Sequence, residues 1–308
     1  MTHALIWLRR DLRFADNPAL QAAIDLGLQP VPVYVHDTSL QTEGSAGQWW
    51  LHHSLAALQQ ELRGRGSDLL ILAGDSLDQL QAAAQACRAS HVFWNRRYEP
   101  AAMERDRLVK TALRDTGLEV ESLAGNLLRE PWTHAKRDGT PYRVFTPFYK
   151  ELLASTPLDM PLPPPVDLPP LPRSLPKGPG LDALGLLPAI PWHAAFGEHW
   201  QPGEAGAWQS LEDFVSGSLV DYPDNRDRPD LPDTSRLSPH LHFGEISPRQ
   251  VRQFIEDRLR HTDTPGLVPA AEAWLRQLAW REFGHHLLWH FPQTAEQPLD
   301  PRFEAFPW

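Results

Sequence analysis

The first 125 residues alternate between two patterns of hydrophobic and polar positions. Short apolar runs rich in Val, Ile, Leu and aromatic residues are typical of buried strands, and they occur at 4–8, 31–36, 69–74, 91–95 and 119–124. Segments with apolar residues at helical spacing separate these runs, at 18–27, 48–66, 76–87 and 101–117. Gly27, Gly66 and Gly117 stand where a helix C-terminal cap would use them. The alternation predicts an α/β fold with a doubly wound, parallel, five-stranded sheet covered by helices on both faces.

The pattern changes in the second half of the chain. Prolines crowd residues 155–192 and exclude a regular helix or a central strand there. Apolar positions at helical spacing return at 203–215, 247–261 and 269–291, and Ser247 followed by Pro248 is a typical helix start. We therefore expect three parts: an α/β domain over 1–130, a Pro-rich linker over 131–195 and an all-α domain over 196–308.

Charge and cysteine content narrow the class of protein. The chain has 308 residues and a net charge of −10, and residues 155–308 alone contribute −9. The second half therefore lacks the overall basic charge that is typical of a nucleic-acid binder. A single cysteine, Cys87, cannot form an internal disulfide, and no apolar run is long enough to span a bilayer. We expect a cytoplasmic protein without a membrane segment or a metal site.

Polar clusters follow two of the predicted strands. Residues 9–17 read "RRDLRFADN" and residues 95–100 read "NRRYEP". Parallel sheets bind ligands at the carboxyl ends of their strands, so both clusters are candidate ligand contacts. No glycine-rich dinucleotide fingerprint or P-loop motif follows any strand. The alternative is that these arginines pair with nearby Asp and Glu at a solvated rim.

The last predicted helix carries an unusual polar face. At 100° per residue, Trp274, Gln277, Arg281 and His285 fall on one stripe, and Trp280 borders it. Such a stripe offers stacking and hydrogen-bond donors together, which suits a heteroaromatic or phosphate-bearing ligand. The alternative to a ligand site is a solvent-exposed helix face whose long side chains extend into water.

A hydroxyl-rich loop precedes the helix that begins at Ser247. The 234–238 loop, "TSRLS", consists of Thr234, Ser235, Arg236, Leu237 and Ser238. Its hydroxyls and backbone N–H groups can cradle a phosphate without a P-loop motif. Upstream, Tyr222 and Arg226 lie on a polar turn. An ordinary surface loop is the alternative.

These pieces occur together and in order in one known family. The stretches "IWLRRDLRFADNPAL", "NRRYEP", "GTPYRVFTPFYK", "TSRLSPHLHFGEISPRQV" and "WLRQLAWREFGHHLLWHFP" resemble those of the DNA photolyase/cryptochrome family. The sequence of residues 236–251 is most similar to those of bacterial photolyases related to the plant cryptochromes. The resemblance covers the whole chain apart from the Pro-rich linker.

The resemblance implies a flavoprotein that repairs UV-damaged DNA. It implies FAD in the helical domain, an antenna chromophore, folate or deazaflavin, on the α/β domain, and light-driven electron transfer from reduced FAD to a pyrimidine dimer. Photolyases extrude the damaged bases from the duplex. The residues that match FAD-contacting positions are Tyr222, Thr234, Ser235, Arg236, Leu237, Ser238, Trp274 and Arg281. Those that match the DNA side are Arg226, Gln277, Trp280 and Arg281, and Trp308 matches the outermost Trp of a relay that photoreduces FAD.

The chain departs from the family pattern at three places. Gln277 stands where dimer-repairing members usually carry Glu, so the lesion can be a cyclobutane dimer or a (6-4) product. Ala101, Ala102, Ala295 and Glu296 replace residues of folate-binding members, which leaves the antenna unassigned. The chain ends at "FEAFPW", before the family's remaining helices, and the resemblance therefore implies a C-terminally truncated member with an incomplete FAD-binding domain.

Three functions follow from this resemblance as alternatives. The first is a deoxyribodipyrimidine photolyase, a monomer that acts on UV-damaged DNA. The second is a cryptochrome-like blue-light receptor, and the third is a non-catalytic photolyase fragment. We expect the chain alone to hold FAD weakly, because half of the family's flavin cradle lies beyond its last residue.

Overall fold

The computed structural model describes residues 2–40, 43–154, 159–261 and 264–306. Its sheet has five parallel strands in the order β3-β2-β1-β4-β5. They are β1 (His3–Leu8), β2 (Gln29–His36), β3 (Leu70–Ala73), β4 (Ala89–Asn95) and β5 (Glu119–Leu123). The order changes direction at β1, as in a doubly wound sheet. The predicted fold of the first part is confirmed.

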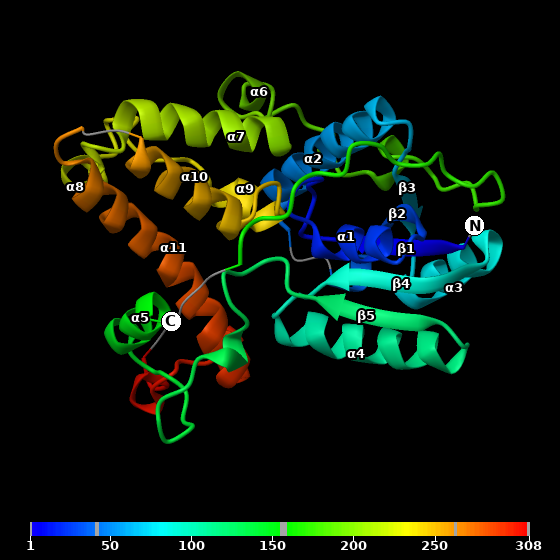
Figure 1. The fold of residues 1–308 in the computed structure, drawn as a ribbon, viewed down its shortest axis with the longest axis horizontal. Helices are drawn as coiled ribbons and strands as arrows, with labels where there is room; N and C mark the ends of the chain where they lie inside the picture. The colour runs from blue at the N-terminus through cyan, green and yellow to red at the C-terminus, as the bar shows by residue number, and fades with distance from the viewer. Residues whose placement is uncertain (1, 41–42, 155–158, 262–263, 307–308) are drawn as a thin grey trace.

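Helices flank both faces of this sheet (Figure 1). On one face, α1 (Pro18–Asp25) and α2 (Ser45–Gly64) cover alternate β1 residues such as Ile6. On the other face, α3 (Ser76–Cys87) and α4 (Pro100–Asp115) cover Leu5 and Trp7. Because successive side chains of a strand point to opposite faces, this arrangement buries β1 on both sides. The three predicted cap glycines, Gly27, Gly66 and Gly117, have φ of 66°, 85° and 88°.

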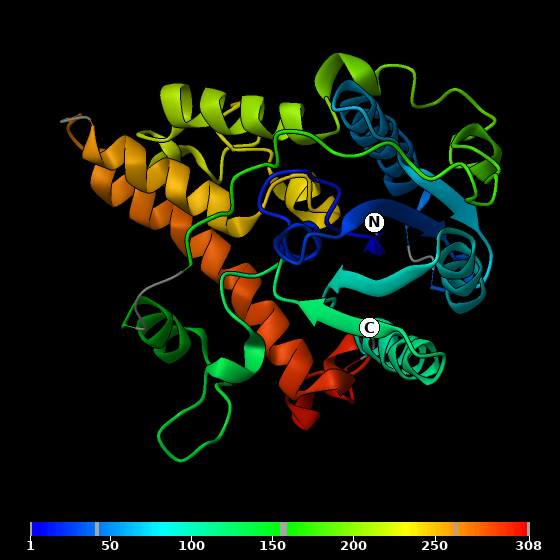
Figure 2. The same ribbon diagram turned by 45° about the vertical axis from the view of Figure 1, so that its right-hand side comes forward.

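The Pro-rich segment crosses the α/β part in an irregular conformation (Figure 2). Leu168 and Leu186 are buried in the core that α1 and α2 share with the sheet. Gly178 passes so close to β3 that a Cβ there would lie 1.7 Å from the carbonyl oxygen of Ile71. The 131–195 range also contains short 3-10 turns at Pro131–Thr133 and Asp182–Leu184, and the helix α5 (Phe145–Ala154), which the sequence did not predict.

Helices predominate in the described part of the chain beyond the linker. The short helices are α6 (Phe196–His199), α8 (Tyr222–Asn225) and α9 (Ser238–Phe243); the longer ones are α7 (Glu204–Asp213), α10 (Pro248–Arg260) and α11 (Leu267–His290). The predicted start of α10 is correct, since the Ser247 hydroxyl accepts from Gln250 N and the Gln250 side chain accepts from Ser247 N. No helix in the described ranges is both long and apolar enough to cross a bilayer.

A buried polar cluster joins the sheet to the helical part. Both Asp16 carboxylate oxygens accept hydrogen bonds from Arg249, at 2.9 and 3.0 Å, and the Ser247 hydroxyl donates to the same carboxylate at 2.5 Å. Arg13 donates to the backbone oxygens of Asp16, Gly125 and Gly244. These contacts fix the loop after β1 against the region between α9 and α10.

Candidate functional site

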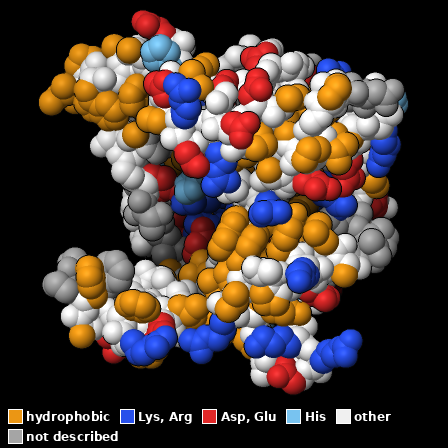
Figure 3. Space-filling view, turned by 90° about the vertical axis from the view of Figure 1, so that its left-hand side faces the viewer, with side chains coloured by type: hydrophobic (Ala, Val, Ile, Leu, Met, Phe, Trp, Pro, Cys, Tyr) orange, Lys and Arg blue, Asp and Glu red, His pale blue; other side chains and the backbone are white. Residues whose placement is uncertain are grey.

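A cavity of about 680 Å³ lies between the carboxyl ends of the strands and the helical part. On the sheet side, Arg10 follows β1, residues 96–99 follow β4 and Asn126 follows β5. The helical part contributes residues of α8, α9 and α11 and the whole 234–238 loop. Figure 3 shows a hollow on the side of the molecule that carries α8 and α11, with basic, acidic and histidine side chains visible inside it.

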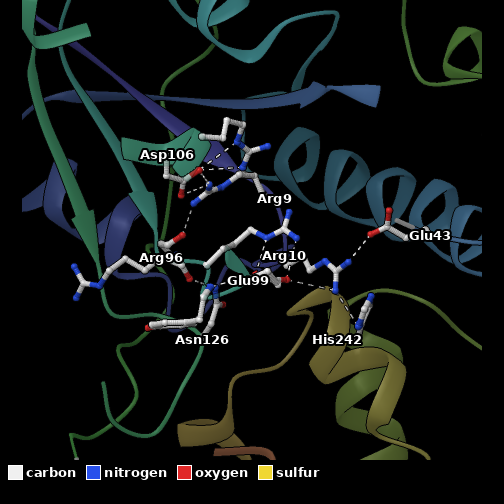
Figure 4. A network of polar contacts seen from close by, with 12 residues as sticks. Arg9, Arg10, Glu43, Arg96, Glu99, Asp106, Asn126 and His242 are labelled. Atoms are coloured by element: carbon white, nitrogen blue, oxygen red, sulfur yellow. Dashed lines mark hydrogen bonds and ion pairs between the residues drawn. The ribbon is translucent and has the colours of Figure 1, made fainter. Parts of the chain in front are cut away.

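Arginines on the sheet side of the cavity pair with carboxylates (Figure 4). Arg9 Nη1 donates to both Asp106 oxygens at 2.7 and 2.6 Å. Arg97 donates to both oxygens of Glu99, at 2.9 Å from Nη2 and 3.3 Å from Nε. The sequence left open whether the polar clusters at 9–17 and 95–100 bind a ligand or pair with acidic residues. The structure shows that their arginines form ion pairs. The members that also line the cavity are Arg10, Arg96 and Arg97.

Glu99 is held as an oriented, ionised carboxylate on this wall. Burial raises its pKa, but Arg97 and Arg10 outweigh that effect and hold the pKa at about 2. Its side chain keeps 38% of its surface exposed and lines the cavity. Glu99 therefore offers hydrogen-bond acceptors to whatever occupies the cavity.

Arg10 links the loop after β1 to α9. Its Nη2 donates to Glu43 at 2.7 Å, and its Nη1 lies 3.0 Å from His242 Nδ1. A guanidinium can only donate, so His242 Nδ1 accepts and the ring proton sits on Nε2. Desolvation and then Arg10 lower the pKa of His242, so its ring is neutral at neutral pH.

All five residues of the 234–238 loop line the cavity. Arg236 has a left-handed backbone, with φ of 53°, and its guanidinium carbon lies 3.9 Å from the centre of the Trp200 ring. In the part of the chain that the structure describes, no carboxylate forms an ion pair with Arg236. Leu237 is buried and anchors the loop to the helical core. The loop thus brings three hydroxyl-bearing residues and one arginine to the cavity, which is compatible with the predicted phosphate cradle.

A glycine sets the distance between α9 and the loop after β1. Gly244 ends α9 with φ of 69°, and a Cβ there would lie 2.1 Å from the carbonyl oxygen of Arg10. Any side chain at this position would push α9 away from the loop after β1. The two sides of the cavity are therefore in direct backbone contact.

Four residues of α11 predicted to share a stripe lie along the cavity. They are Trp274, Gln277, Arg281 and His285. Arg281 Nη1 donates to the backbone oxygen of Asn126 at 2.9 Å, which ties α11 to the loop after β5. His285 Nδ1 lies 2.9 Å from the backbone oxygen of Arg281 and must donate to it, which leaves Nε2 as an acceptor. Burial and then Arg281 lower the pKa of His285 to about 4.

The remaining predicted site residues lie in different surroundings. Arg226 and Tyr222 line the cavity from α8 and its C-terminal end. Trp280 does not line it; its ring stacks on Phe145 of α5, with ring centres 3.7 Å apart, and 47% of its surface is exposed. Trp308, the predicted outer relay residue, lies outside the described residues.

Some cavity residues were not singled out individually from the sequence. Glu99, Arg97 and Asn126 come from loops that follow strands β4 and β5. The polar cluster "NRRYEP" was the signal for two of them, but their orientation toward α11 depends on contacts across the chain.

Two glutamates, the buried Glu282 and the half-buried Glu204, join the helical part to loops that follow the strands. Glu282 Oε2 accepts from the backbone N–H of Leu128 at 2.9 Å and of Arg129 at 3.3 Å. Glu204 accepts in the same way from Phe14 N at 2.7 Å. Burial raises the pKa of both glutamates to about 7, against the opposing backbone hydrogen bonds.

A parallel α/β sheet joined to a helical part by a long irregular segment, with a large basic cavity between them, places the chain among proteins of the photolyase and cryptochrome fold. The crystal structure of a bacterial class III photolyase from Agrobacterium tumefaciens superimposes with a TM-score of 0.93 at 41% identity, and the match covers 100% of this chain and 63% of that one. The chain belongs to the DNA photolyase family, whose model matches residues 4–169.

Curated relatives include both photolyases and cryptochromes. A deoxyribodipyrimidine photo-lyase of Agrobacterium fabrum is 42% identical over 305 residues, which cover 99% of this chain and 63% of the relative. Cryptochrome-2 of Arabidopsis thaliana is 34% identical over 317 residues, which cover 99% of this chain and 51% of that protein. The chain thus spans about half to two thirds of the length of these relatives.

Proposed function

We propose that the cavity binds FAD and that the chain takes part in light-dependent repair of pyrimidine dimers in DNA, as a deoxyribodipyrimidine photolyase. The observation that carries the proposal is the charge of the cavity. Six arginines line it with two carboxylates, Glu99 and Asp227, in a protein with a net charge of −10. Five of the six pair with a carboxylate, and Arg236 has no ion pair in the part of the chain that the structure describes. Its lining arginines are Arg10, Arg96, Arg97, Arg226, Arg236 and Arg281.

The residues of the cavity fit a dinucleotide. A volume of about 680 Å³ lies within the range of small-molecule sites. The hydroxyls and backbone N–H groups of the 234–238 loop, together with Arg236 and Tyr222, would hold the phosphates and a ribose. Trp274 and Arg281 would bind nearer the ring system. When bound, FAD supplies the one-electron chemistry that amino-acid side chains lack.

The DNA side of the proposal concerns α8 and α11. Arg226 and Gln277 line the cavity and would contact the damaged bases there. A guanidinium adds a charge-assisted hydrogen bond, and an amide can both donate and accept toward a pyrimidine. Trp280 would contact DNA only on the outer surface of α11, because its ring stacks on Phe145. The relay role of Trp308 and an antenna chromophore, folate or deazaflavin, also remain part of this proposal.

A blue-light receptor is the second candidate. Gln277 favours it, since an amide cannot share a proton with an anionic dimer as a carboxyl can. Similarity to the cryptochrome of Arabidopsis thaliana also supports it. A receptor needs FAD in the same cavity but no affinity for lesions.

A repair assay separates these functions. The chain, supplied with FAD, is incubated under blue light with oligonucleotides that carry one cyclobutane dimer or one (6-4) product. Gln277→Glu should maintain or raise repair of the cyclobutane dimer and lower that of the (6-4) product, while Gln297→Glu, at an exposed position away from the cavity, should change neither. FAD binding with no preference for either lesion and no repair would contradict the photolyase proposal and favour the receptor.

A further inference from the structure

One part of the cavity wall is polar without an excess of positive charge. Glu99, His242 and His285 line the cavity from three different elements. Arg10 lies 2.7 Å from Glu43 and 4.0 Å from Glu99, and Arg97 pairs with Glu99, so these two arginines and two glutamates balance. We call Glu99, His242 and His285 the neutral wall.

The 234–238 loop differs from the neutral wall in charge. Arg236 stacks on Trp200, and in the described ranges no carboxylate pairs with it. A phosphate that enters the cavity is therefore attracted to Arg236, whereas the balanced charges around Glu99 give it no such attraction. The 234–238 loop therefore favours the charged part of a ligand, and the neutral wall favours an uncharged part.

The neutral wall also has a defined pattern of donors and acceptors. His242 accepts from Arg10 at Nδ1, so its Nε2 donates; His285 donates to a backbone oxygen at Nδ1, so its Nε2 accepts. Glu99 accepts at its free lone pairs, because Arg97 holds the carboxylate in place. The wall thus offers one imidazole donor, one imidazole acceptor and one carboxylate.

We propose that the neutral wall binds the uncharged, nucleoside-like part of the ligand. Glu99 accepts hydrogen bonds from its hydroxyl or amino groups, and His242 and His285 contact the edge of a nitrogen heterocycle that carries an acceptor and a donor. This inference rests on the proposed function, since it assigns the central diphosphate and a nucleoside-like end of a dinucleotide such as FAD to two regions of one cavity. It makes Glu99, His242 and His285 determinants of specificity rather than of phosphate affinity.

Calorimetric titrations with two probes test this assignment. FAD contains both the diphosphate and the nucleoside-like parts, and inorganic pyrophosphate contains only the diphosphate. Glu99→Gln and His285→Ala should each weaken FAD binding about tenfold, as expected for the loss of one hydrogen bond to a charged or buried partner, and leave pyrophosphate binding within about twofold. Arg236→Ala should weaken both probes. Glu104→Gln, at an exposed residue that pairs with Arg107, is the matched control.

The outcomes separate this inference from the proposed function. Unchanged FAD binding in both wall variants, or an equal loss of FAD and pyrophosphate, would overturn the assignment of the neutral wall. A parent chain that binds FAD but not pyrophosphate would also overturn it, because the diphosphate would have no site of its own. A parent chain that binds neither probe would overturn the proposed function as well. Thermal unfolding of each variant verifies that the fold is retained.

Discussion

Replacing Glu282 with glutamine tests how the sheet side of the cavity is joined to α11. The Glu282 side chain is 3% exposed and accepts from two backbone N–H groups at 2.9 and 3.3 Å. Glutamine has nearly the same shape and can still accept through its amide oxygen, but it carries no charge. The substitution therefore removes a buried titratable group and keeps the packing of the side chain.

The size of the effect follows from the pKa of Glu282. Burial raises it from 4.5 to about 7, so the folded state favours the protonated form. The stabilising contribution of the protonated form is fully present below about pH 4.5 and is lost as the pH rises through 7. At about 1.36 kcal/mol per pKa unit, the complete loss is about 3 kcal/mol, of which about 2 kcal/mol falls between pH 5.5 and 8.5.

Urea unfolding followed by tryptophan fluorescence measures this difference. The free energy of unfolding of Glu282→Gln minus that of the parent should rise by about 2 kcal/mol between pH 5.5 and 8.5, because every other titrating group is common to both proteins. Glu119→Gln, at an exposed position on β5, should show no such rise. A constant difference across this range would refute the view that burial raises the pKa of Glu282 in the folded state.

Three other substitutions test the framework of the cavity. Gly244→Ala should lower the free energy of unfolding by at least about 2 kcal/mol, since its Cβ would lie 2.1 Å from the Arg10 carbonyl oxygen, and an unchanged melting temperature would contradict this. Asp16→Asn should cost about 3 kcal/mol in urea unfolding, because it leaves the buried Arg249 guanidinium without a carboxylate; a cost below about 1 kcal/mol would argue against this role. Burial lowers the pKa of His134 to about 4, so stability falls as the pH drops from 6.5 toward 4; His134→Gln should lessen that fall by about 2 kcal/mol at pH 4.5, and identical acid unfolding curves would speak against it.

The sheet and the long helices could be predicted because their signals are local. Strand runs such as residues 31–36 are apolar throughout, and the Ser247–Pro248 start of α10 depends on residues within one turn. The α11 stripe could also be placed, because a helix repeats its faces at a fixed angle and four polar side chains shared one face.

Features that depend on distant residues could not be predicted. The helix α5 lies in the segment predicted to be a linker. Trp280 stacks on Phe145 of this helix and does not line the cavity. His242 gains its neutral state partly from Arg10, which is 232 positions away in sequence. Glu99 belongs to the site only because the loop after β4 and the helix α11 line the same cavity. Sequence periodicity carries no information on such pairings.

Titration of FAD into the purified chain tests the central claim most directly. We expect saturable 1:1 binding with a Kd in the micromolar range, about −8 kcal/mol, from the phosphate contacts of the 234–238 loop and the ring contacts of α11. Arg236→Ala should weaken this binding about tenfold, while Arg107→Ala, at an exposed residue of α4, should leave it unchanged. The absence of saturable binding up to about 1 mM FAD, or an equal response of the two arginine variants, would contradict a flavin site in this cavity.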